Sequence, residues 1–179
     1  MRTCLSAALA LFAGAGIMLA AEPAKQAPKV VLKSADGKKE VDLAKLVEKG
    51  PVLIRLTCAC SGCDQELPYF QKLQDAYNDK GLQTVAVFQE KPEAASTYAV
   101  KKGLKFQWLA DPKREMWKTF DAKTMPTNIL IEKGGKIAAI AAGCDASGLL
   151  ANKVSEKVAR AAGTAAINVK NRVEEKARK

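Results

Sequence analysis

The alternation of apolar and polar residues divides the chain into segments of strand length and helix length. Residues 51–57 (PVLIRLT) and 82–90 (LQTVAVFQE) are mostly apolar runs, which predicts two buried strands, and residues 104–110 predict a shorter one. Residues 127–143 contain two apolar runs around a Gly-Gly pair, which predicts a β-hairpin. The three strands before the hairpin are far enough apart for a helix to lie between them.

The segments between these strands have helical periodicity. Leu67, Phe70, Leu73 and Tyr77 follow one another at spacings of three, three and four residues, which predicts an amphipathic helix that ends at Gly81. A proline inside this helix is expected to kink or break it early. Four further helices are predicted, at residues 43–50, 91–103, 111–121 and 145–161.

Residues that favour helix ends stand at several of these boundaries. Asp42 can cap the helix that stops at Gly50, while Asp111 and Pro112 suit the cap and the first position of the helix over 111–121. Residues 30–43 precede the first helix and read as two short strands joined by an Asp-Gly turn. The element order predicts an α/β fold with one central mixed sheet flanked by helices and preceded by an N-terminal β-hairpin.

The chain is expected to form one main domain between two terminal segments. Residues 1–21 have a basic start, an apolar run and a small-residue ending, as in a secretory signal peptide, with a retained membrane anchor as the competing interpretation. Residues 22–29 then form a polar tether and residues 30–161 the domain. Residues 162–179 form a basic C-terminal extension, either an exposed helix or a frayed tail. Export to a periplasmic or extracellular, oxidising compartment would follow from the signal peptide.

Composition narrows the function classes. The chain is 48% hydrophobic and 27% charged, which is typical of a globular protein, and its formal charge is +10. The basic residues are scattered and no aromatic-basic interleaving is present, so the sequence favours electrostatic attraction of acidic partners over nucleic-acid binding. The chain has no histidine, which excludes Ser-His-Asp catalysis, Cys-His catalysis and imidazole metal sites.

Four cysteines remain after signal cleavage, and three of them lie together. Cys58, Cys60 and Cys63 fall where the strand over 51–57 meets the following helix, while Cys144 follows the hairpin. Cys60 and Cys63 form a C-x-x-C pair at a helix N-terminus, where free N–H groups and the helix dipole stabilise a thiolate. The spacing therefore predicts redox chemistry in which Cys60 attacks and Cys63 resolves the mixed disulfide.

Residues 51–73 resemble the active-site segment of the thioredoxin-like superfamily, especially its exported TlpA/ResA and redoxin (AhpC/TSA-like) branch. Members of this branch have a glutamate three residues after the C-x-x-C pair and a proline five residues after it, and Glu66 and Pro68 stand at these places. The resemblance extends over roughly residues 28–161. It implies a thioredoxin-like fold and a thiol–disulfide oxidoreductase activity.

A second motif lies far downstream. Met125, Pro126 and Thr127 match the Val/Thr-Pro-Thr segment of the same branch, whose proline is cis and lies against the disulfide. The resemblance implies that Pro126 flanks Cys60 and that these three residues bind the substrate, with the Met125 backbone pairing with a peptide strand.

The sequence also departs from the family pattern. Ala59 stands where the family usually has tryptophan, and Ile54 where it often has a buried acidic or amide residue for proton transfer. Glu66 is open to two interpretations, as a substitute for that missing group or as a solvated helix residue. Trp108 and Trp117, at core spacing, are interpreted as packing residues.

Cys58 is an addition to the family motif. With Cys60 and Cys63 it gives C-x-C-x-x-C, which offers three soft ligands for Cu(I) or zinc, with Cys144, Met125 or an external group as a possible fourth. The alternative is that Cys58 is a small buried apolar residue and Cys144 an incidental loop thiol. Thr57, three residues before Cys60, gives a third interpretation, the T-x-x-C of a peroxiredoxin-like thiol peroxidase.

These observations predict an exported thiol–disulfide oxidoreductase that exchanges dithiols and disulfides with protein partners. The predicted catalytic residues are Cys60 and Cys63, the predicted substrate-binding residues follow from the resemblance, and Cys58, Thr57 and Glu66 are possible accessory groups, as is Cys144. No organic cofactor and no resident metal are expected, because a partner dithiol can supply the electrons. The protein is expected to act as a monomer.

Overall fold

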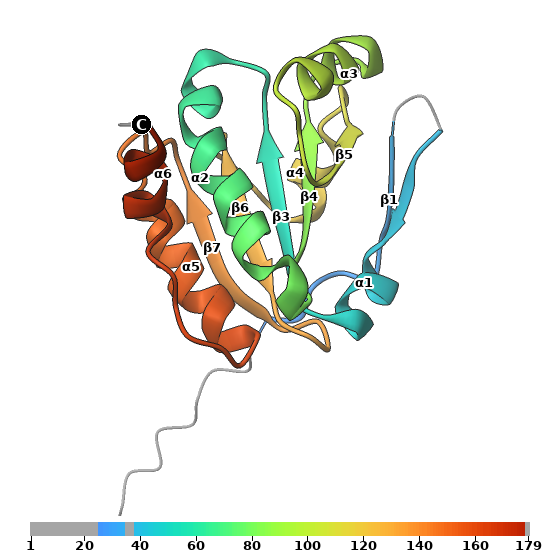
Figure 1. Cartoon of the computed structure of the whole chain (residues 1–179). Helices are drawn as coiled ribbons and strands as arrows, with labels where there is room; N and C mark the ends of the chain where they lie inside the picture. The colour runs from blue at the N-terminus through green and yellow to red at the C-terminus, as the bar shows by residue number, and fades with distance from the viewer. Residues whose placement is uncertain (1–24, 35–37, 178–179) are drawn as a thin grey trace, which may run out of the picture.

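The computed structural model describes residues 25–34 and 38–177, and a five-stranded mixed sheet forms its centre (Figure 1). The strands are β1 (Val31–Lys33), β2 (Glu40–Asp42), β3 (Val52–Thr57), β4 (Gln83–Phe88), β5 (Gln107–Ala110), β6 (Thr127–Ile131) and β7 (Ile137–Ala142). The order across the sheet is β5-β4-β3-β6-β7, while β1 and β2 form a separate antiparallel pair. β4 runs parallel to β3 and β5, whereas β6 runs antiparallel to β3 and β7.

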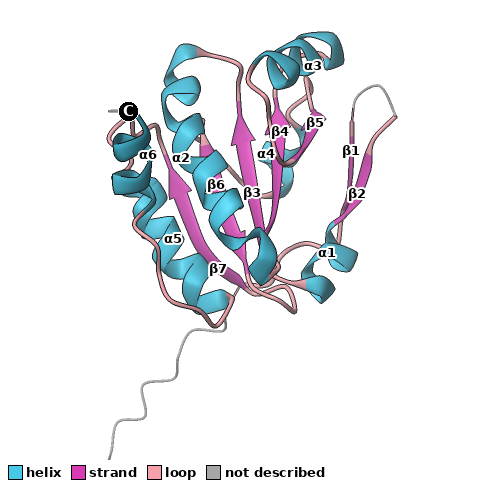
Figure 2. Cartoon of the chain, in the orientation of Figure 1, coloured by secondary structure: helices cyan, strands magenta, loops and turns pink. Residues whose placement is uncertain are grey.

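Helices lie on both faces of this sheet, as Figure 2 shows. Their bounds are α1 (Leu43–Lys49), α2 (Ser61–Tyr77), α3 (Pro92–Lys101), α4 (Glu115–Thr119), α5 (Leu149–Ala161) and α6 (Val169–Ala177), with a short 3₁₀ helix, η1 (Asn78–Lys80), after α2. The predicted central mixed sheet with flanking helices and an N-terminal hairpin is confirmed. Gly81 follows η1 in the left-handed conformation, as expected of a helix-ending glycine.

β3 is the central strand of the sheet. All six of its residues are buried, because each face of the strand packs on a different helical layer. Leu53 packs with Phe70 of α2 and Val158 of α5. Its neighbour Ile54 belongs to the opposite cluster, which includes Trp117 of α4. Successive strand residues point to opposite faces, so one uninterrupted apolar run can supply both layers. This packing fixes the carboxyl end of β3, where the cysteines follow.

Three helix predictions need correction. The helix predicted over 111–121 begins at Glu115, so Pro112 lies before it, although the Asp111 carboxylate still accepts the N–H groups of Glu115 and Met116 at 3.0 and 2.8 Å. The helix predicted from residue 145 begins at Leu149. Pro68 does not break α2, which continues to Tyr77. The cap predicted at Asp42 is confirmed, since its carboxylate accepts the N–H groups of the first turn of α1.

The C-terminal extension packs on the domain and is not frayed over its described residues. Val169, at the start of α6, has no exposed surface and lies in the cluster formed by α2, α5 and β3. The Tyr77 hydroxyl accepts the Ile167 N–H at 2.9 Å, and the Ser155 hydroxyl donates to the Ile167 carbonyl at 2.7 Å. The extension is therefore helical, as one of the two interpretations had it, and it is anchored to the domain by a buried residue. Figure 1 shows α6 beside α2 and α5.

The predicted N-terminal tether is bound at its described end. Gln26 forms a β-bridge with Lys136, and the Ala27 N–H donates to the Gly135 carbonyl at 2.8 Å. The Ile137 N–H donates to the Lys25 carbonyl at 2.9 Å. These contacts hold the segment against the β6–β7 turn. The predicted signal peptide over residues 1–21 lies outside the described residues.

Candidate active site

The three clustered cysteines lie in the loop between β3 and α2 and differ in exposure. Cys58 directly follows β3 and is 3% exposed, and Cys63, in the first turn of α2, is 4% exposed. Cys60 is exposed and occupies the N-cap position of α2 with an extended backbone. Cys60 therefore lies at the positive end of the dipole of a 17-residue helix, a position that favours a thiolate.

The three sulfur atoms form one group. Cys58 and Cys60 are joined by a disulfide, and the Sγ atom of Cys63 lies 3.4 Å from the Sγ atom of Cys58. All three sulfurs lie within 4.8 Å of one another. The spacing had suggested a Cys60–Cys63 disulfide, whereas the structure bonds Cys60 to Cys58 and leaves Cys63 as a buried free thiol. The catalytic roles of Cys60 and Cys63 stay a prediction.

A buried ion pair lies beside Cys63. Arg55 of β3 and Glu66 of α2 have side chains that are each 2% exposed, and Arg55 Nη2 lies 2.6 Å from Glu66 Oε2. Arg55 also donates to the side-chain oxygen of Asn128 at 2.9 Å and to the Cys63 carbonyl at 3.4 Å. The guanidinium therefore links β3, β6 and the first turn of α2. Its donors satisfy groups that burial would otherwise leave without partners.

Glu66 is thus buried, which rules out its interpretation as a solvated helix residue, while its role as a proton-transfer group stays a prediction. The signal for this placement was in the sequence, since Glu66 continues the apolar face of α2 four residues before Phe70. Arg55 was the one charge in an apolar strand, so the pairing of the two could have been inferred. Ile54, at the family position of the buried acid, points to the opposite face and packs in the apolar cluster of α1 and α4.

The loop after β7 crosses the first turn of α2. The Asp145 N–H donates to Glu66 Oε1 at 2.6 Å, and the Cys144 thiol donates to the Gly62 carbonyl at 2.9 Å. Desolvation, followed by the negative charge of Glu66, raises the pKa of the Cys144 thiol. The loop after β7 therefore lies next to the cysteine site. Cys144 stands outside the group of three sulfurs and is poorly suited to form a thiolate.

The Met125–Pro126 peptide bond is cis, as the resemblance implied. Thr127 begins β6 opposite Leu56, one residue before the end of β3, so the segment lies at the cysteine edge of the sheet. The Gly143 N–H donates to the Pro126 carbonyl at 2.9 Å, which ties this segment to the Cys144 loop. Met125 packs against the apolar cluster on the α4 face of the sheet. Substrate binding by residues 125–127 stays a prediction.

Four side chains at this edge were not singled out from the sequence. Glu90, after β4, accepts the Ala59 N–H at 2.9 Å and so holds the middle of the cysteine loop. Asp64, next to Cys63, accepts from the Tyr98 hydroxyl at 3.0 Å and from Lys102 Nζ at 2.7 Å. The hydrogen bond from Lys102 is the main cause that lowers the Asp64 pKa below its ordinary value. Only the folded chain brings these partners together, because they lie about 30 to 40 residues from the cysteines in sequence.

The other sequence-predicted groups lie close by or in the core. Thr57, the last residue of β3, is 3% exposed and lines a small internal cavity together with Cys63 and Phe88. Trp117 is 3% exposed, in agreement with its interpretation as a packing residue. Trp108 is half-buried and has the ammonium of Lys39 over its ring, 3.0 Å from the centroid.

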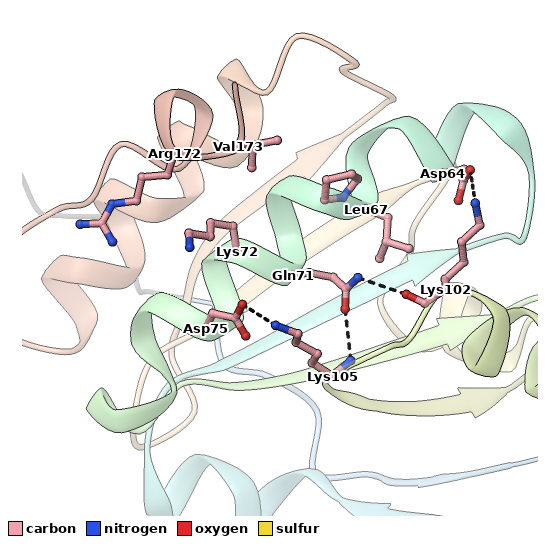
Figure 3. Close-up of a pocket in the computed structure, with 10 residues that line it drawn as sticks. Asp64, Leu67, Gln71, Lys72, Asp75, Lys102, Lys105, Arg172 and Val173 are labelled. Atoms are coloured by element: carbon pink, nitrogen blue, oxygen red, sulfur yellow. Dashed lines mark hydrogen bonds and ion pairs between the residues drawn. The ribbon is translucent and has the colours of Figure 1, made fainter. Parts of the chain in front are cut away.

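A groove of about 620 Å³ runs along the outer side of α2 toward α6 (Figure 3). Leu67, Pro68 and Val173 give it an apolar lining, and Lys72 and Arg172 bring positive charge from α2 and α6. Two ion pairs, Asp64–Lys102 and Asp75–Lys105, bound its other side. The groove contains no cysteine, so its chemistry is separate from that of the sulfur group.

The sulfur group is the one cluster of three or more Cys, Asp or Glu side chains within the described residues that could hold a metal ion. Thiolate sulfur is a ligand that suits Cu(I) and zinc. Cys144 stands outside the group and donates to the Gly62 carbonyl, and Met125 packs against the apolar cluster on the α4 face of the sheet. Among the described residues, no helix combines the length and hydrophobicity that crossing a membrane requires.

Comparisons with known proteins agree with this geometry. The sequence profile of the AhpC/TSA family matches residues 23–140. The thiol-disulfide oxidoreductase ResA of Bacillus thuringiensis subsp. konkukian is 33% identical over 117 residues, which is 65% of this chain and 67% of the relative. ResA of Bacillus subtilis is 29% identical over 118 residues. The chain spans about two thirds of the length of these relatives, 67% and 65% respectively.

Solved structures share the same architecture. A crystal structure from Chlorobium tepidum, described as a thiol:disulfide interchange protein DsbE, matches with a TM-score of 0.70 at 25% identity and covers 80% of this chain and 100% of that one. A solution structure described as a thioredoxin from Neisseria meningitidis matches with a TM-score of 0.63 at 28% identity, covering 75% and 90%. The predicted thioredoxin-like fold is confirmed.

Proposed function

Because the chain belongs to the AhpC/TSA family, in its ResA-like branch, we propose that it exchanges dithiols and disulfides with protein partners through Cys60. The observation that supports this proposal is the placement of an exposed sulfur at the N-terminus of α2, with two buried sulfurs within 4.8 Å of it. The activity implied by the ResA and DsbE names agrees with the sequence prediction of a thiol–disulfide oxidoreductase.

Reduction of a substrate disulfide begins at Cys60. The Cys60 thiolate attacks one sulfur of a substrate disulfide, forms a mixed disulfide, and releases the other substrate sulfur as a thiolate. The Cys63 thiolate attacks Cys60 Sγ and releases the second substrate thiolate, so that two electrons pass from the chain to the substrate. A partner dithiol then reduces the intramolecular disulfide. The same steps in reverse oxidise a substrate dithiol.

The cis-proline segment suits the binding of an extended substrate. Pro126 has no N–H to donate, and residues 125–127 lie at the same edge of the sheet as the cysteines. We assign to this segment the pairing with a substrate backbone, because a peptide bound there by main-chain hydrogen bonds would lie at the same edge of the sheet as the cysteines. Export of the chain and action as a monomer are parts of the same proposal, and cell fractionation and size-exclusion chromatography test them.

An insulin-type reduction assay with dithiothreitol as electron donor tests the activity. Cys60→Ser is expected to lower the catalysed rate to background, a loss of at least about 100-fold, because the exposed nucleophile is removed. Cys144→Ser is the matched control and is expected to stay within about twofold of the parent chain, since this thiol bonds to Gly62 outside the sulfur group. Disulfide exchange that persists in Cys60→Ser contradicts the proposal.

Soft-metal binding is the second candidate, favoured by the mutual approach of three sulfurs. It requires all three cysteines to be reduced and deprotonated. Metal stoichiometry of the reduced chain, with Cu(I) or zinc as the probe and Cys58→Ser as the variant, tests it. Tight binding that depends on Cys58 in a chain without exchange activity favours this candidate over the oxidoreductase.

A further inference from the structure

Cys58 is the residue of the site that the two-cysteine mechanism does not use. It is 3% exposed, so a protein substrate or a soluble thiol cannot reach its sulfur directly. Both of the other cysteines do reach it, since Cys60 is bonded to it and Cys63 Sγ lies 3.4 Å away. A sulfur that merely filled space beside β3 would not need to contact both members of a redox pair.

We propose that Cys58 is a third exchanging thiol and that it resolves mixed disulfides at Cys60 independently of Cys63. This inference rests on the proposed function, because it assumes that Cys60 forms the mixed disulfide. The Cys58 thiolate attacks Cys60 Sγ, the Cys58–Cys60 bond forms, and the substrate leaves as a thiolate. The chain then holds the disulfide that the structure contains, with Cys63 still reduced.

The disulfide can next move within the cluster without any outside reagent. The Cys63 thiolate attacks Cys58 Sγ, which is within contact distance, so the Cys58–Cys63 bond forms and Cys60 leaves as a thiolate. The number of disulfides and of electrons is unchanged in this step. The oxidised chain then presents an exposed Cys60 thiolate at the helix N-terminus while the disulfide is buried between two residues that are 3% and 4% exposed.

In this arrangement the exposed Cys60 thiolate attacks substrates, while the disulfide is held between the buried Cys58 and Cys63. A chain with two cysteines has no free nucleophile once it is oxidised, whereas this cluster keeps one thiol at every stage. The oxidised chain can therefore attack a second substrate disulfide at Cys60 and be displaced again by a substrate thiolate. That sequence rearranges substrate disulfides with no net transfer of electrons, which is the chemistry of a disulfide isomerase.

Reaction with the aromatic disulfide 5,5′-dithiobis(2-nitrobenzoate) tests the inference in the full chain. Cys4 and Cys144 are replaced by serine so that only the cluster reacts. Reduced Cys63→Ser is expected to release two equivalents of thionitrobenzoate, one on attack by Cys60 and one when Cys58 resolves the adduct. Cys58→Ser is also expected to release two, because Cys63 resolves. The double variant Cys58→Ser/Cys63→Ser is expected to stop at one, with the second release at least about 100-fold slower, since no intramolecular thiol remains.

Two outcomes distinguish a failure of the inference about Cys58 from a failure of the proposed function. A Cys63→Ser chain that stops at one equivalent with a stable adduct, as the double variant does, overturns the role of Cys58. Rapid release in Cys60→Ser overturns the proposed function itself. Cys58→Ala is examined alongside Cys58→Ser, because alanine suits the apolar site if serine unfolds the chain. Alkylation and peptide mapping of the oxidised parent should find the free thiol at both Cys60 and Cys63, and a thiol found only at Cys58 contradicts the scheme.

Discussion

The two ends of α2 are anchored by different chemistry. At its N-terminal end, an exposed disulfide sulfur lies over a buried thiol, and an Arg55–Glu66 ion pair is enclosed beneath them. At its C-terminal end, the Tyr77 hydroxyl lies 2.8 Å from the Ser155 hydroxyl and joins it to the residues that lead into α6. The N-terminal end combines an ion pair with reactive sulfurs. The polar groups at the C-terminal end are uncharged and form hydrogen bonds with one another.

This difference shows how one helix can hold a reactive group in place. The neutral end packs α2 against α5 and α6 through buried apolar residues, and this packing opposes movement of the helix along the sheet. The charged end fixes the rotation of the first turn, because Arg55 bonds both Glu66 and the Cys63 carbonyl. Removal of a charge should therefore destabilise the molecule more than removal of a neutral group of similar burial.

Loss of Arg55 is expected to have the largest effect. Arg55→Met leaves the Glu66 carboxylate buried without its partner, which should lower the free energy of unfolding by about 3–5 kcal/mol. Urea unfolding followed by circular dichroism measures this. The double variant Arg55→Met/Glu66→Gln is the control and should recover at least half of the loss, because no uncompensated charge remains. A single variant as stable as the parent chain would show that the ion pair does not hold this end.

Loss of the Tyr77 hydroxyl is expected to have the second largest effect on stability. Tyr77→Phe keeps the ring but leaves the Ile167 N–H and the Ser155 hydroxyl short of a partner, at a cost of about 1–3 kcal/mol. Tyr69→Phe is the matched control, since that hydroxyl makes one 3.5 Å contact with the Ala146 carbonyl at the surface, and its loss should cost less than about 0.5 kcal/mol. Equal unfolding midpoints for the two variants would contradict the importance of the neutral network.

Shortening an apolar side chain at the start of α6 is a further test of the neutral end of α2. Val169→Ala removes two buried methyl groups from the cluster under α6 and should cost about 1.5–2 kcal/mol. Val173→Ala, one turn further on and half-buried beside the groove, should cost less than about 1 kcal/mol. Amide hydrogen exchange of residues 167–174 gives a local measurement. Unchanged protection in Val169→Ala would mean that α6 is held without this contact.

The smallest effect is expected from the surface pair beside Cys63. The Asp64 pKa is lowered from 3.8, chiefly by the hydrogen bond from Lys102, so its contribution to stability is present above that value and is lost as the pH falls through the lower folded-state pKa. Asp64→Asn should cost about 0.2–1 kcal/mol at pH 7. The difference between the two unfolding free energies should vanish in strong acid. A difference between the two unfolding free energies that grows as the pH falls would contradict a lowered Asp64 pKa.

Hydrophobic periodicity was sufficient to predict most of the fold. The apolar run over 51–57 and the 3-3-4 spacing of the α2 residues correctly identified the central strand and its helix. Helix starts were less accurate, because Asp111 and Asp145 both accept N–H groups four or five residues ahead and so resemble N-caps that stand several residues too early. α6 was predicted to be exposed because its many charges conceal the one valine that is completely buried.

The site was predictable in outline and less so in detail. The cysteine positions and the cis-proline follow from local spacing and from the family resemblance, and the structure places them at one edge of the sheet. The burial of Arg55 and Glu66 depends on a contact between β3 and α2 that spacing within either element does not specify. The same holds for Glu90, which bonds the cysteine loop from the end of β4. Which two of three neighbouring sulfurs are bonded is a question of geometry that sequence spacing alone leaves open.

The β-bridge of Gln26 with Lys136 determines how the molecule is oriented on anything attached ahead of it. Ile131, at the end of β6, lies opposite Val52, so the β6–β7 turn is at the amino end of β3, whereas Cys58 follows its carboxyl end. The length of a six-residue strand, roughly 20 Å, separates the two ends. A tether or a fused partner that enters at Lys25 would therefore be attached at the end of the sheet opposite to the sulfur cluster.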